Sequence, residues 1–273
     1  MITKRIIDEK GIDQTEDTVL VLGYFDGLHK GHQALFEKAR EIAVEQGLKI
    51  AVMTFPESPK LAFVRYQPEL MLHLASPEDR MAQLESLGVD YLYLIDFTSH
   101  FAGNTARDFF EKYVSRLRAK AVVAGFDYHF GSDRKESHEL RDYFNGKIVI
   151  VPSVNLDNRK ISSTRIRETI AVGDMLKTQE LLGYPLSTRG IVVHGNARGR
   201  TIGYPTANLA PLDRVLLPGD GVYVADVEHN GQRYRGMASV GKNVTFDGDE
   251  LRFEVNIFDF SQDIYGDTIR IFW

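Results

Sequence analysis

Two histidines placed three residues apart, His29 and His32, have the side chains and the spacing to act on one phosphate group. They lie in the segment GYFDGLHKGH at residues 23–32, where Gly27 and Gly31 allow a ligand to approach the backbone closely. A helix that begins here would direct its N-terminus, which favours anions, at the same place. Donors positioned in this way stabilise the charge that develops at phosphorus during group transfer. The alternative is a turn that carries two solvent-exposed histidines.

A second candidate for phosphate binding is the segment ISSTRIR at residues 161–167. Ser162 or Ser163 can cap a helix that begins there, and Thr164 can donate a hydrogen bond. Arg165 can form charge-assisted bonds to a phosphate. The alternative is an ordinary helix cap followed by a basic surface turn.

A glycine-rich segment, GNARGRTIGYPTANL at residues 195–209, could wrap a polyphosphate. Its glycines are Gly195, Gly199 and Gly203. If the end of the segment is extended, Thr206 and Asn208 point to the same side. Their two neutral oxygens suit Mg²⁺, which takes its remaining ligands from water and substrate phosphates. The alternative is a long hairpin loop.

Strand and helix signals alternate along the first two-thirds of the chain and predict an α/β domain with a parallel sheet. Strands are expected at 18–25, 49–55, 91–95, 121–124 and 147–151, and helices at 32–46, 77–87 and 105–117. Such sheets bind ligands beyond the carboxyl ends of their strands, and the His29 loop follows the first of these strands.

The pattern changes after Leu182, where short strand-like runs separated by Gly- and Asp-rich turns replace the helices. The runs are 190–194, 221–228, 232–240, 251–258 and 268–273. They predict a small antiparallel β-barrel. We therefore expect two domains, at residues 1–183 and 184–273.

Composition narrows the class of protein further. The 273 residues carry a formal net charge of −5, which disfavours a general nucleic-acid binder. The absence of cysteine excludes disulfides, zinc–thiolate sites and cysteine nucleophiles. No signal peptide and no membrane-spanning run is visible, so we expect a soluble cytoplasmic protein without a membrane partner.

The histidine segment and ISSTRIR together resemble the HxGH nucleotidyltransferases, and in particular the adenylyltransferase half of the prokaryotic bifunctional riboflavin kinase/FMN adenylyltransferases. The segment GFDYHFG at residues 125–131 is similar to a loop of that family near its nucleotide and flavin sites. The resemblance implies a Rossmann-like domain in which FMN attacks the α-phosphorus of ATP and pyrophosphate leaves. It implies Mg²⁺ to offset the phosphate charge.

The resemblance also implies site residues for adenylyl transfer. His29, His32 and Arg165 would be catalytic, and Ser163 and Thr164 would help Arg165 to hold the β- and γ-phosphates. The remaining nucleotide contacts would be Gly23, Phe25, Asp26, Gly27 and Asp127, and the flavin contacts would be Phe55, Phe126 and Tyr128. After the second strand this chain has FPESP where the family reads FDPHP, which puts Glu57 near an anionic substrate.

The glycine-rich segment resembles the GRxxGxPTAN signature of riboflavin kinases, and the resemblance spans residues 18–273. It implies kinase contacts to ATP from Gly195, Arg198, Gly199, Gly203, Pro205 and Thr206, with Thr206 and Asn208 as metal ligands. Glu254 matches the family's general base and flavin contact, although by its pattern alone it is a solvent-facing carboxylate on an alternating strand. Asn256 stands where many relatives carry His, and relatives continue past the last strand into helical segments, whereas this sequence stops at Trp273.

We therefore expect FAD biosynthesis, with riboflavin converted to FMN and FMN to FAD at the expense of ATP. The expected partners are these small molecules. One alternative is an FMN adenylyltransferase whose barrel binds flavin without kinase activity. The other is a non-catalytic flavin sensor.

Overall fold

The computed structural model describes residues 1–195, 205–245 and 248–273. Contacts between these residues divide the chain into two compact units. The first contains Met1–Met71 and Pro77–Ile161, and the second contains Leu72–Ser76 and Ser162–Trp273. The predicted order, an α/β unit followed by an antiparallel barrel, is confirmed.

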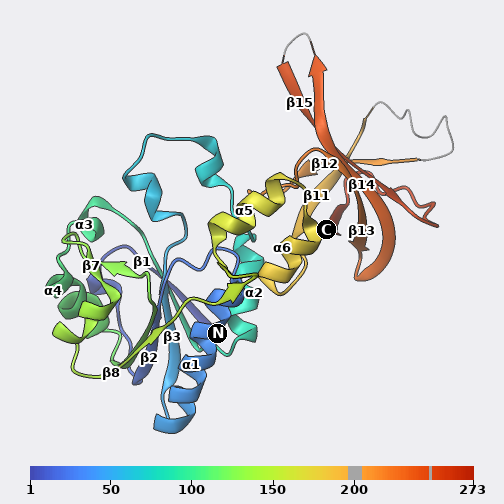
Figure 1. Ribbon diagram of the computed structural model, residues 1–273. Coiled ribbons are helices and arrows are strands. Elements are labelled where there is room, and N and C mark those ends of the chain that lie inside the picture. Colours follow the sequence, from blue (N-terminus) through green and yellow to red (C-terminus); the bar gives the residue numbers. More distant parts are fainter. Residues whose placement is uncertain (196–204, 246–247) are drawn as a thin grey trace. The chain divides into compact units, whose positions relative to one another are not determined.

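The first unit is built on a six-stranded sheet in which all neighbouring strands are parallel (Figure 1). The strand order is β1-β4-β3-β2-β5-β8. The strands are β1 (Ile2–Ile6), β2 (Thr18–Leu22), β3 (Lys49–Thr54), β4 (Tyr91–Ile95), β5 (Ala119–Gly125) and β8 (Lys147–Val151). Because β2 lies in the middle, the loop that follows it emerges at the centre of the carboxyl edge.

The central strands are apolar throughout because both faces of the sheet are covered. All five residues of β2 are buried, with Val19 and Val21 in one core cluster and Leu20 and Leu22 in the other. Helix α1 (Lys30–Gln46) and helix α2 (Pro77–Ser86) contribute apolar side chains to the first cluster. The short helices α3 (Ser99–Ala102) and α4 (Ala106–Phe109) contribute aromatic rings to the second. The unit is therefore a three-layer α/β sandwich.

The helix expected at 105–117 is shorter than predicted. Thr105 caps α4 with a capping box, and the backbone then widens into a π-helical turn at Phe110–Val114. Phe110, Tyr113 and Val114 are all buried in this turn. The apolar residues that predicted one long helix therefore lie partly in a wider π-helical turn, which places the Phe110 and Tyr113 rings in the core.

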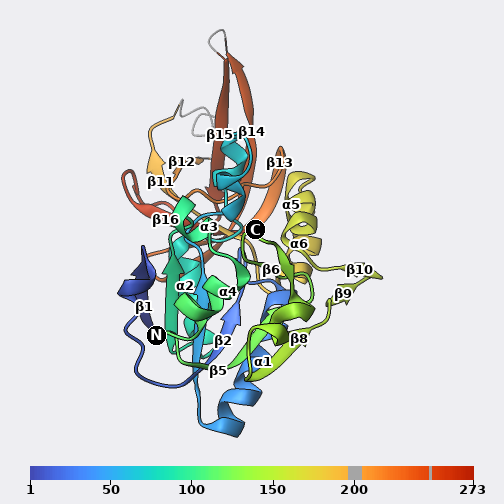
Figure 2. The same cartoon turned by 90° about the vertical axis from the view of Figure 1, so that its left-hand side faces the viewer.

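Short 3-10 helices occur at Glu9–Gly11, Pro59–Ala62, Pro68–Met71 and Ser137–Asp142. Strands β6 (His129–Phe130) and β7 (Lys135–Glu136) pair as one small hairpin. Strands β9 (Asn155–Leu156) and β10 (Arg159–Lys160) pair as another, which extends away from the sheet (Figure 2).

The second unit contains a closed barrel in which all strand pairs are antiparallel. The order is β11-β12-β15-β14-β13-β16. The strands are β11 (Ser187–Val193), β12 (Ala207–Pro211), β13 (Gly221–His229), β14 (Gln232–Thr245), β15 (Gly248–Ile257) and β16 (Thr268–Phe272). Strand β12 was expected only as the end of a loop.

Two helices, α5 (Ser163–Ala171) and α6 (Met175–Leu182), belong to the same unit as the barrel. The amide of Gly219 donates to the carbonyl of Ile170 at 2.9 Å, which joins the end of α5 to the loop before β13. The segment Leu72–Ser76 also belongs here, since His73 exchanges backbone hydrogen bonds with Arg214 and Leu216. Among the described residues no helix is both long and apolar enough to cross a membrane.

Candidate active sites

The histidine loop begins at the carboxyl end of β2 and ends in the first turn of α1. Phe25 has a φ of 57° and turns its ring inward, where it is 1% exposed and packs edge-on against the His32 ring at 5.2 Å. A Cβ at Gly23 would lie 2.7 Å from the same Phe25 ring, so this position requires glycine. Gly27 has a φ of 76°, which glycine adopts without strain. The buried Phe25 ring thus supports the histidine loop from its core side.

The two histidines lie against each other inside this loop. Their rings stack with centroids 3.7 Å apart and planes 13° from parallel. His29 is 5% exposed, and its burial lowers the pKa of its imidazole to about 4. Burial also lowers the pKa of His32 well below the ordinary value, with the neighbouring His29 and Arg80 acting in the same direction. Both rings are therefore neutral at pH 7, and the alternative of two solvent-exposed histidines is excluded.

The proton of neutral His29 can be assigned from its hydrogen bond. The backbone N–H of His32 donates to Nδ1 of His29 at 3.2 Å, so His29 caps helix α1 with this nitrogen. A neutral imidazole that accepts at Nδ1 carries its proton on Nε2. His29 therefore offers an N–H donor at the start of α1, where an anion is favoured.

Two acidic residues named for the nucleotide site differ in their surroundings. Asp26 is 4% exposed, and its charge opposes the lowering of the His29 pKa. Asp127 is more exposed and pairs with the ammonium of Lys160 on β10. The same ammonium lies 4.6 Å from the centre of the Phe126 ring, which is 45% exposed. Lys160 also acts electrostatically on both histidines, so a further cation borders the histidine loop.

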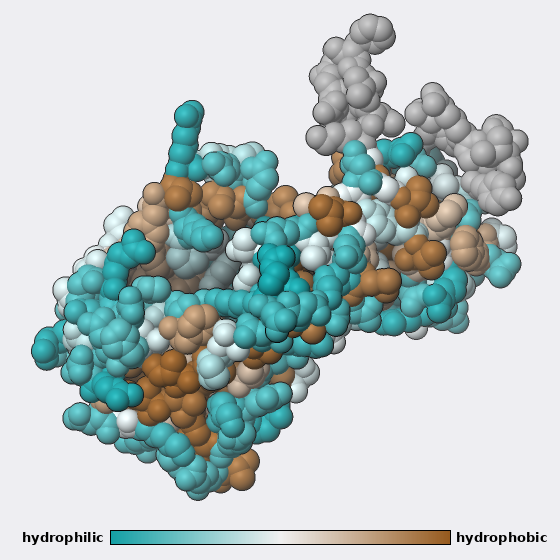
Figure 3. Space-filling model, viewed as in Figure 1, coloured by the Kyte–Doolittle hydropathy of each residue, from teal (hydrophilic) through white to brown (hydrophobic). Residues whose placement is uncertain are grey.

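An aromatic pocket of about 540 Å³ opens beside this region of the first unit. Its lining includes two of the predicted flavin contacts, Phe55 and Tyr128, and does not include Phe126. The Phe97 ring contacts two other rings edge-on, with centroid distances of 5.1 Å to Phe55 and 5.6 Å to Phe63. Figure 3 shows that apolar side chains reach the surface of this unit between polar ones. The pocket can receive a flat aromatic ligand.

The predicted phosphate residues of ISSTRIR begin helix α5 in the second unit. Ser162 is the cap, since its Oγ accepts from the amide of Arg165 at 3.3 Å. Ser163 is the first residue of the helix, Thr164 is exposed, and Arg165 is 7% exposed. Their action on the same phosphate as His29 and His32 remains a prediction.

Three of the residues named for the kinase site, Thr206, Asn208 and Glu254, lie together on the outer face of the barrel. Asn208 on β12 lies directly opposite Glu254 on β15, which in turn lies opposite Ser239 on β14. Directly opposed residues of antiparallel strands share a face, so these three side chains form one row. Thr206 donates from Oγ1 to Oε2 of Glu254 at 3.4 Å. Asn256, two residues further along β15, donates from Nδ2 to the carbonyl of Pro205 at 2.7 Å and is 9% exposed.

The same outer face carries an exposed apolar strip beside Glu254. Val222, Val224 and Met237 are 64%, 74% and 45% exposed, respectively. Val222 pairs with Ser239, and Val224 pairs with Met237, so the strip continues the row that contains Glu254. An apolar surface thus adjoins a carboxylate.

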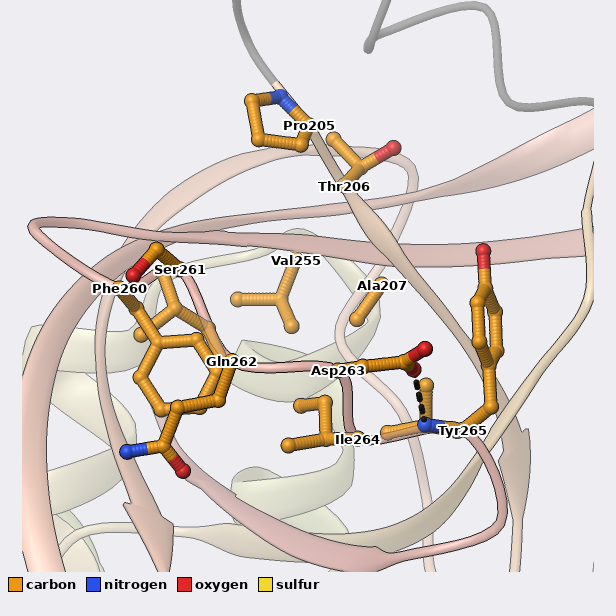
Figure 4. Close-up of a pocket in the computed structure, with 12 residues that line it drawn as sticks. Pro205, Thr206, Ala207, Val255, Phe260, Ser261, Gln262, Asp263, Ile264 and Tyr265 are labelled. Carbon is orange, nitrogen blue, oxygen red and sulfur yellow. Dashed lines mark hydrogen bonds between the residues drawn. The ribbon is translucent and has the colours of Figure 1, made fainter.

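A pocket of about 400 Å³ lies between Thr206 and the loop at residues 260–265 (Figure 4). Pro205 and Thr206 lie above it, and the loop from Phe260 to Tyr265 forms its lower wall. The Tyr265 ring stacks on the His194 ring with their centroids 3.9 Å apart. Sequence reasoning missed His194, because a single histidine after a strand has no distinctive pattern.

Gly195 lies next to the predicted metal ligand Asn208. A Cβ at Gly195 would lie 2.2 Å from Nδ2 of Asn208, so the glycine makes room for this amide. Arg198, Gly199 and Gly203, which were also named for ATP binding, lie outside the described residues.

Two family models match adjacent parts of the chain. The FAD synthetase model matches residues 11–165, which include the histidine loop, and the riboflavin kinase model matches residues 182–273, which include Glu254. The chain belongs to the bifunctional riboflavin kinase/FMN adenylyltransferase family. The resemblance drawn from its motifs is confirmed.

Curated relatives support this membership over most of the chain. The bifunctional riboflavin kinase/FMN adenylyltransferase of Listeria monocytogenes is 40% identical over 93% of this chain and 82% of that protein. That of Bacillus subtilis is 38% identical over 96% of this chain and 84% of that protein. A solved structure described as a macrolide-efflux protein from Streptococcus pneumoniae is 57% identical, with a TM-score of 0.97. It matches 100% of this chain and 90% of that one.

Proposed function

We propose that this chain makes FAD from riboflavin and ATP in two steps, with adenylyl transfer at the histidine loop and phosphorylation at the outer face of the barrel. The chain is an enzyme of FAD biosynthesis by family membership. The observation that carries the division of labour is that each family model covers one of the two residue clusters described above. We place the boundary between the activities near residue 184, as the sequence suggests.

For adenylyl transfer, an oxygen of the FMN phosphate forms a bond to the α-phosphorus of ATP. The bond from that phosphorus to the β-phosphate oxygen breaks, and pyrophosphate leaves with the electron pair. The N–H at Nε2 of His29 and the ring of His32 stabilise the charge that builds on the α-phosphate oxygens. No nucleophile from the protein is required. Ser163, Thr164 and Arg165 would hold the departing phosphates.

The flavin ring of FMN would occupy the aromatic pocket of the first unit. Its volume of about 540 Å³ lies in the range of small-molecule sites, and Phe55 and Tyr128 offer faces and edges to a flat ring. Phe126 remains a candidate for stacking at the rim.

For phosphorylation, Glu254 takes the proton of the riboflavin 5′-hydroxyl as that oxygen attacks the γ-phosphorus of ATP. The apolar strip Val222, Val224 and Met237 would receive the riboflavin ring on the same face as the base. The pocket below Thr206 would receive ATP, with Gly195 and Pro205 at its border. The bond between the γ-phosphorus and the oxygen that bridges it to the β-phosphorus breaks, and ADP leaves with its electron pair.

Magnesium fits the oxygen donors on the barrel. Thr206 supplies a hydroxyl and Asn208 an amide oxygen next to the Glu254 carboxylate, which is the kind of set that Mg²⁺ accepts alongside water and phosphate. When bound, the ion would offset the phosphate charge. We also expect the protein in the cytoplasm, where its small-molecule substrates are available.

The test separates the two steps by product. The purified chain is incubated with ATP and Mg²⁺ and either riboflavin or FMN, and the flavins are separated by chromatography. The proposal predicts FAD from both. FAD from FMN alone would support an adenylyltransferase with an inactive barrel, and bound flavin without turnover in either reaction would support a sensor. Removal of the metal with EDTA should abolish both reactions, and added Mg²⁺ should restore them.

A further inference from the structure

A buried guanidinium joins the two loops of the adenylyl-transfer site. Arg80 on helix α2 is 8% exposed. Its Nη1 donates to the carbonyl of Phe55 at 2.9 Å, and its Nη2 donates to the carbonyl of Tyr24 at 2.6 Å and to the hydroxyl of Thr54. The Thr54 hydroxyl in turn donates to the carbonyl of Tyr24 at 2.7 Å. Four groups therefore share one hydrogen-bonded network.

These acceptors lie at the carboxyl ends of two neighbouring parallel strands. Tyr24 follows β2 and opens the loop that carries His29 and His32. Phe55 follows β3 and lines the aromatic pocket. One side chain from a third element thus fixes the backbone of the histidine loop relative to the backbone of the pocket.

Nearby acidic residues favour the charged form of the buried Arg80 side chain. Burial lowers the pKa of the guanidinium, and the negative charges of Asp26 and Glu57 oppose this effect. The guanidinium also lies 5.3 Å from the centre of the Tyr24 ring. Glu57, the acidic residue of the FPESP segment, therefore acts electrostatically in favour of the charged form of Arg80. A buried cation is costly to keep, and its removal takes a donor from the Phe55 carbonyl and leaves the Tyr24 carbonyl with only the Thr54 hydroxyl of this network.

We propose that Arg80 is a positioning residue for adenylyl transfer, which holds the histidine loop and the flavin pocket in the register that brings the FMN phosphate to the α-phosphorus of ATP. The inference rests on the proposed role of His29 and His32. Phosphoryl and adenylyl transfers depend on such register, since a displacement of about 1 Å can cost on the order of 100-fold in rate. Lysine cannot replace the arginine fully, because an ammonium lacks the planar fork that reaches two carbonyls in fixed directions.

The test compares Arg80→Lys and Arg80→Gln with Arg40→Gln. Arg40 also donates to a backbone carbonyl, that of Leu87, but lies on the exposed side of α1. Initial rates of FAD formation from FMN and ATP give kcat and KM for each variant. We expect kcat to fall about 10-fold in Arg80→Lys and about 100-fold in Arg80→Gln, with KM for ATP within about twofold of wild type. Arg40→Gln should match wild type, and riboflavin phosphorylation should be unchanged in all three.

Thermal unfolding and FMN binding, measured by quenching of flavin fluorescence, distinguish positioning from loss of folding. If Arg80→Gln does not fold, Arg80→Lys decides. Unchanged kcat in a folded Arg80 variant, even with a lower Tm, would overturn the inference. Histidine titration by NMR adds a further readout: the charges that act on His32 are His29, Arg80 and Lys160, so loss of the Arg80 charge should raise the His32 pKa in Arg80→Gln and leave it in Arg80→Lys. His32→Asn is assayed in parallel, because unchanged FAD formation in that variant would contradict the proposed site itself.

Discussion

His29 and His32 stack face to face with their ring centroids 3.7 Å apart. Two protonated rings at this distance would repel each other, and burial lowers the pKa of both. Both imidazoles are therefore neutral, with the Nε2 proton of His29 as a donor and the Phe25 ring packed against His32, and in the proposed reaction the pair would meet ATP in this state. This arrangement can lower the barrier to adenylyl transfer without a positive charge on either ring before ATP binds.

Asparagine at either histidine should impair adenylyl transfer specifically. Asparagine at position 29 can still cap α1, so the substitution removes the ring and leaves the cap. We expect FAD formation from FMN to fall by about 100- to 1000-fold in His29→Asn and in His32→Asn, the usual effect of losing a donor to a developing charge. The exposed His100→Asn serves as the matched control, and flavin chromatography is the assay. Equal activity in all three variants would contradict the site.

The stability of the protein should depend on pH through His29. Its pKa is about 4 in the folded protein and about 6.5 in the unfolded chain, so between these values only the unfolded chain binds the proton. The free energy of unfolding should therefore decrease as the pH falls from 6.5 to 4, with a contribution from His29 on the order of 3 kcal/mol.

Urea unfolding followed by circular dichroism at pH 7 and pH 4.5 measures this effect. His29→Asn should lose part of the difference between the two pH values, whereas His100→Asn should keep it. An unchanged pH dependence in His29→Asn would show that this imidazole is not the buried neutral group described here.

Most of the sheet could be predicted from its apolar runs. The expected strands at 91–95 and 147–151 match β4 and β8, because each is a short branched or aromatic run between turn signals. Strand β1 was missed because it lies at the sheet edge and buries only Ile6. Strand β12 was missed because its five residues include one fully buried side chain, Leu209, and end in proline. Edge and short strands make too few buried contacts to impose a pattern.

The candidate site residues that belong to sequence motifs could be predicted, whereas a residue whose contacts arise only in the folded interior could not. His29 was proposed from its spacing with His32, Thr206 from its alternation with Asn208, and Glu254 from the resemblance alone. The structure brings Thr206 and Glu254 into contact. Arg80 was missed because an arginine in the sequence PEDRM is typical of an exposed helix face. Its role depends on the carbonyls at two strand ends, which no local spacing records.

The aromatic pocket predicts an effect on FMN affinity. Phe55→Ala removes a lining ring that contacts Phe97 and Phe101. We expect KM for FMN in FAD formation to rise about 10-fold, since loss of an aromatic contact is worth about 1 kcal/mol or more, and KM for ATP to stay unchanged. Tyr66→Ala removes a 66% exposed ring outside the lining and should match wild type. A higher KM for ATP instead would assign the pocket to the nucleotide.

Gly195→Ala tests the packing of Asn208 in the kinase site. The added Cβ would lie 2.2 Å from the Asn208 amide and must displace it. We expect riboflavin phosphorylation to fall by about 10-fold or more while FAD formation from FMN is retained. At Gly11 a Cβ would meet Ile6 at 3.7 Å, an ordinary contact, so Gly11→Ala is the control for the substitution. Equal loss of both activities in Gly195→Ala would indicate general unfolding.

One chain should carry two separable catalytic sites, and a single comparison of products tests this separation. Glu254→Gln and His32→Asn are each incubated with riboflavin, ATP and Mg²⁺, and in parallel with FMN and ATP. We expect that Glu254→Gln forms FAD from FMN at the wild-type rate but leaves riboflavin unphosphorylated, whereas His32→Asn converts riboflavin to FMN and stops there. FAD formation from riboflavin by Glu254→Gln at the wild-type rate, or loss of both reactions in either folded variant, would contradict it.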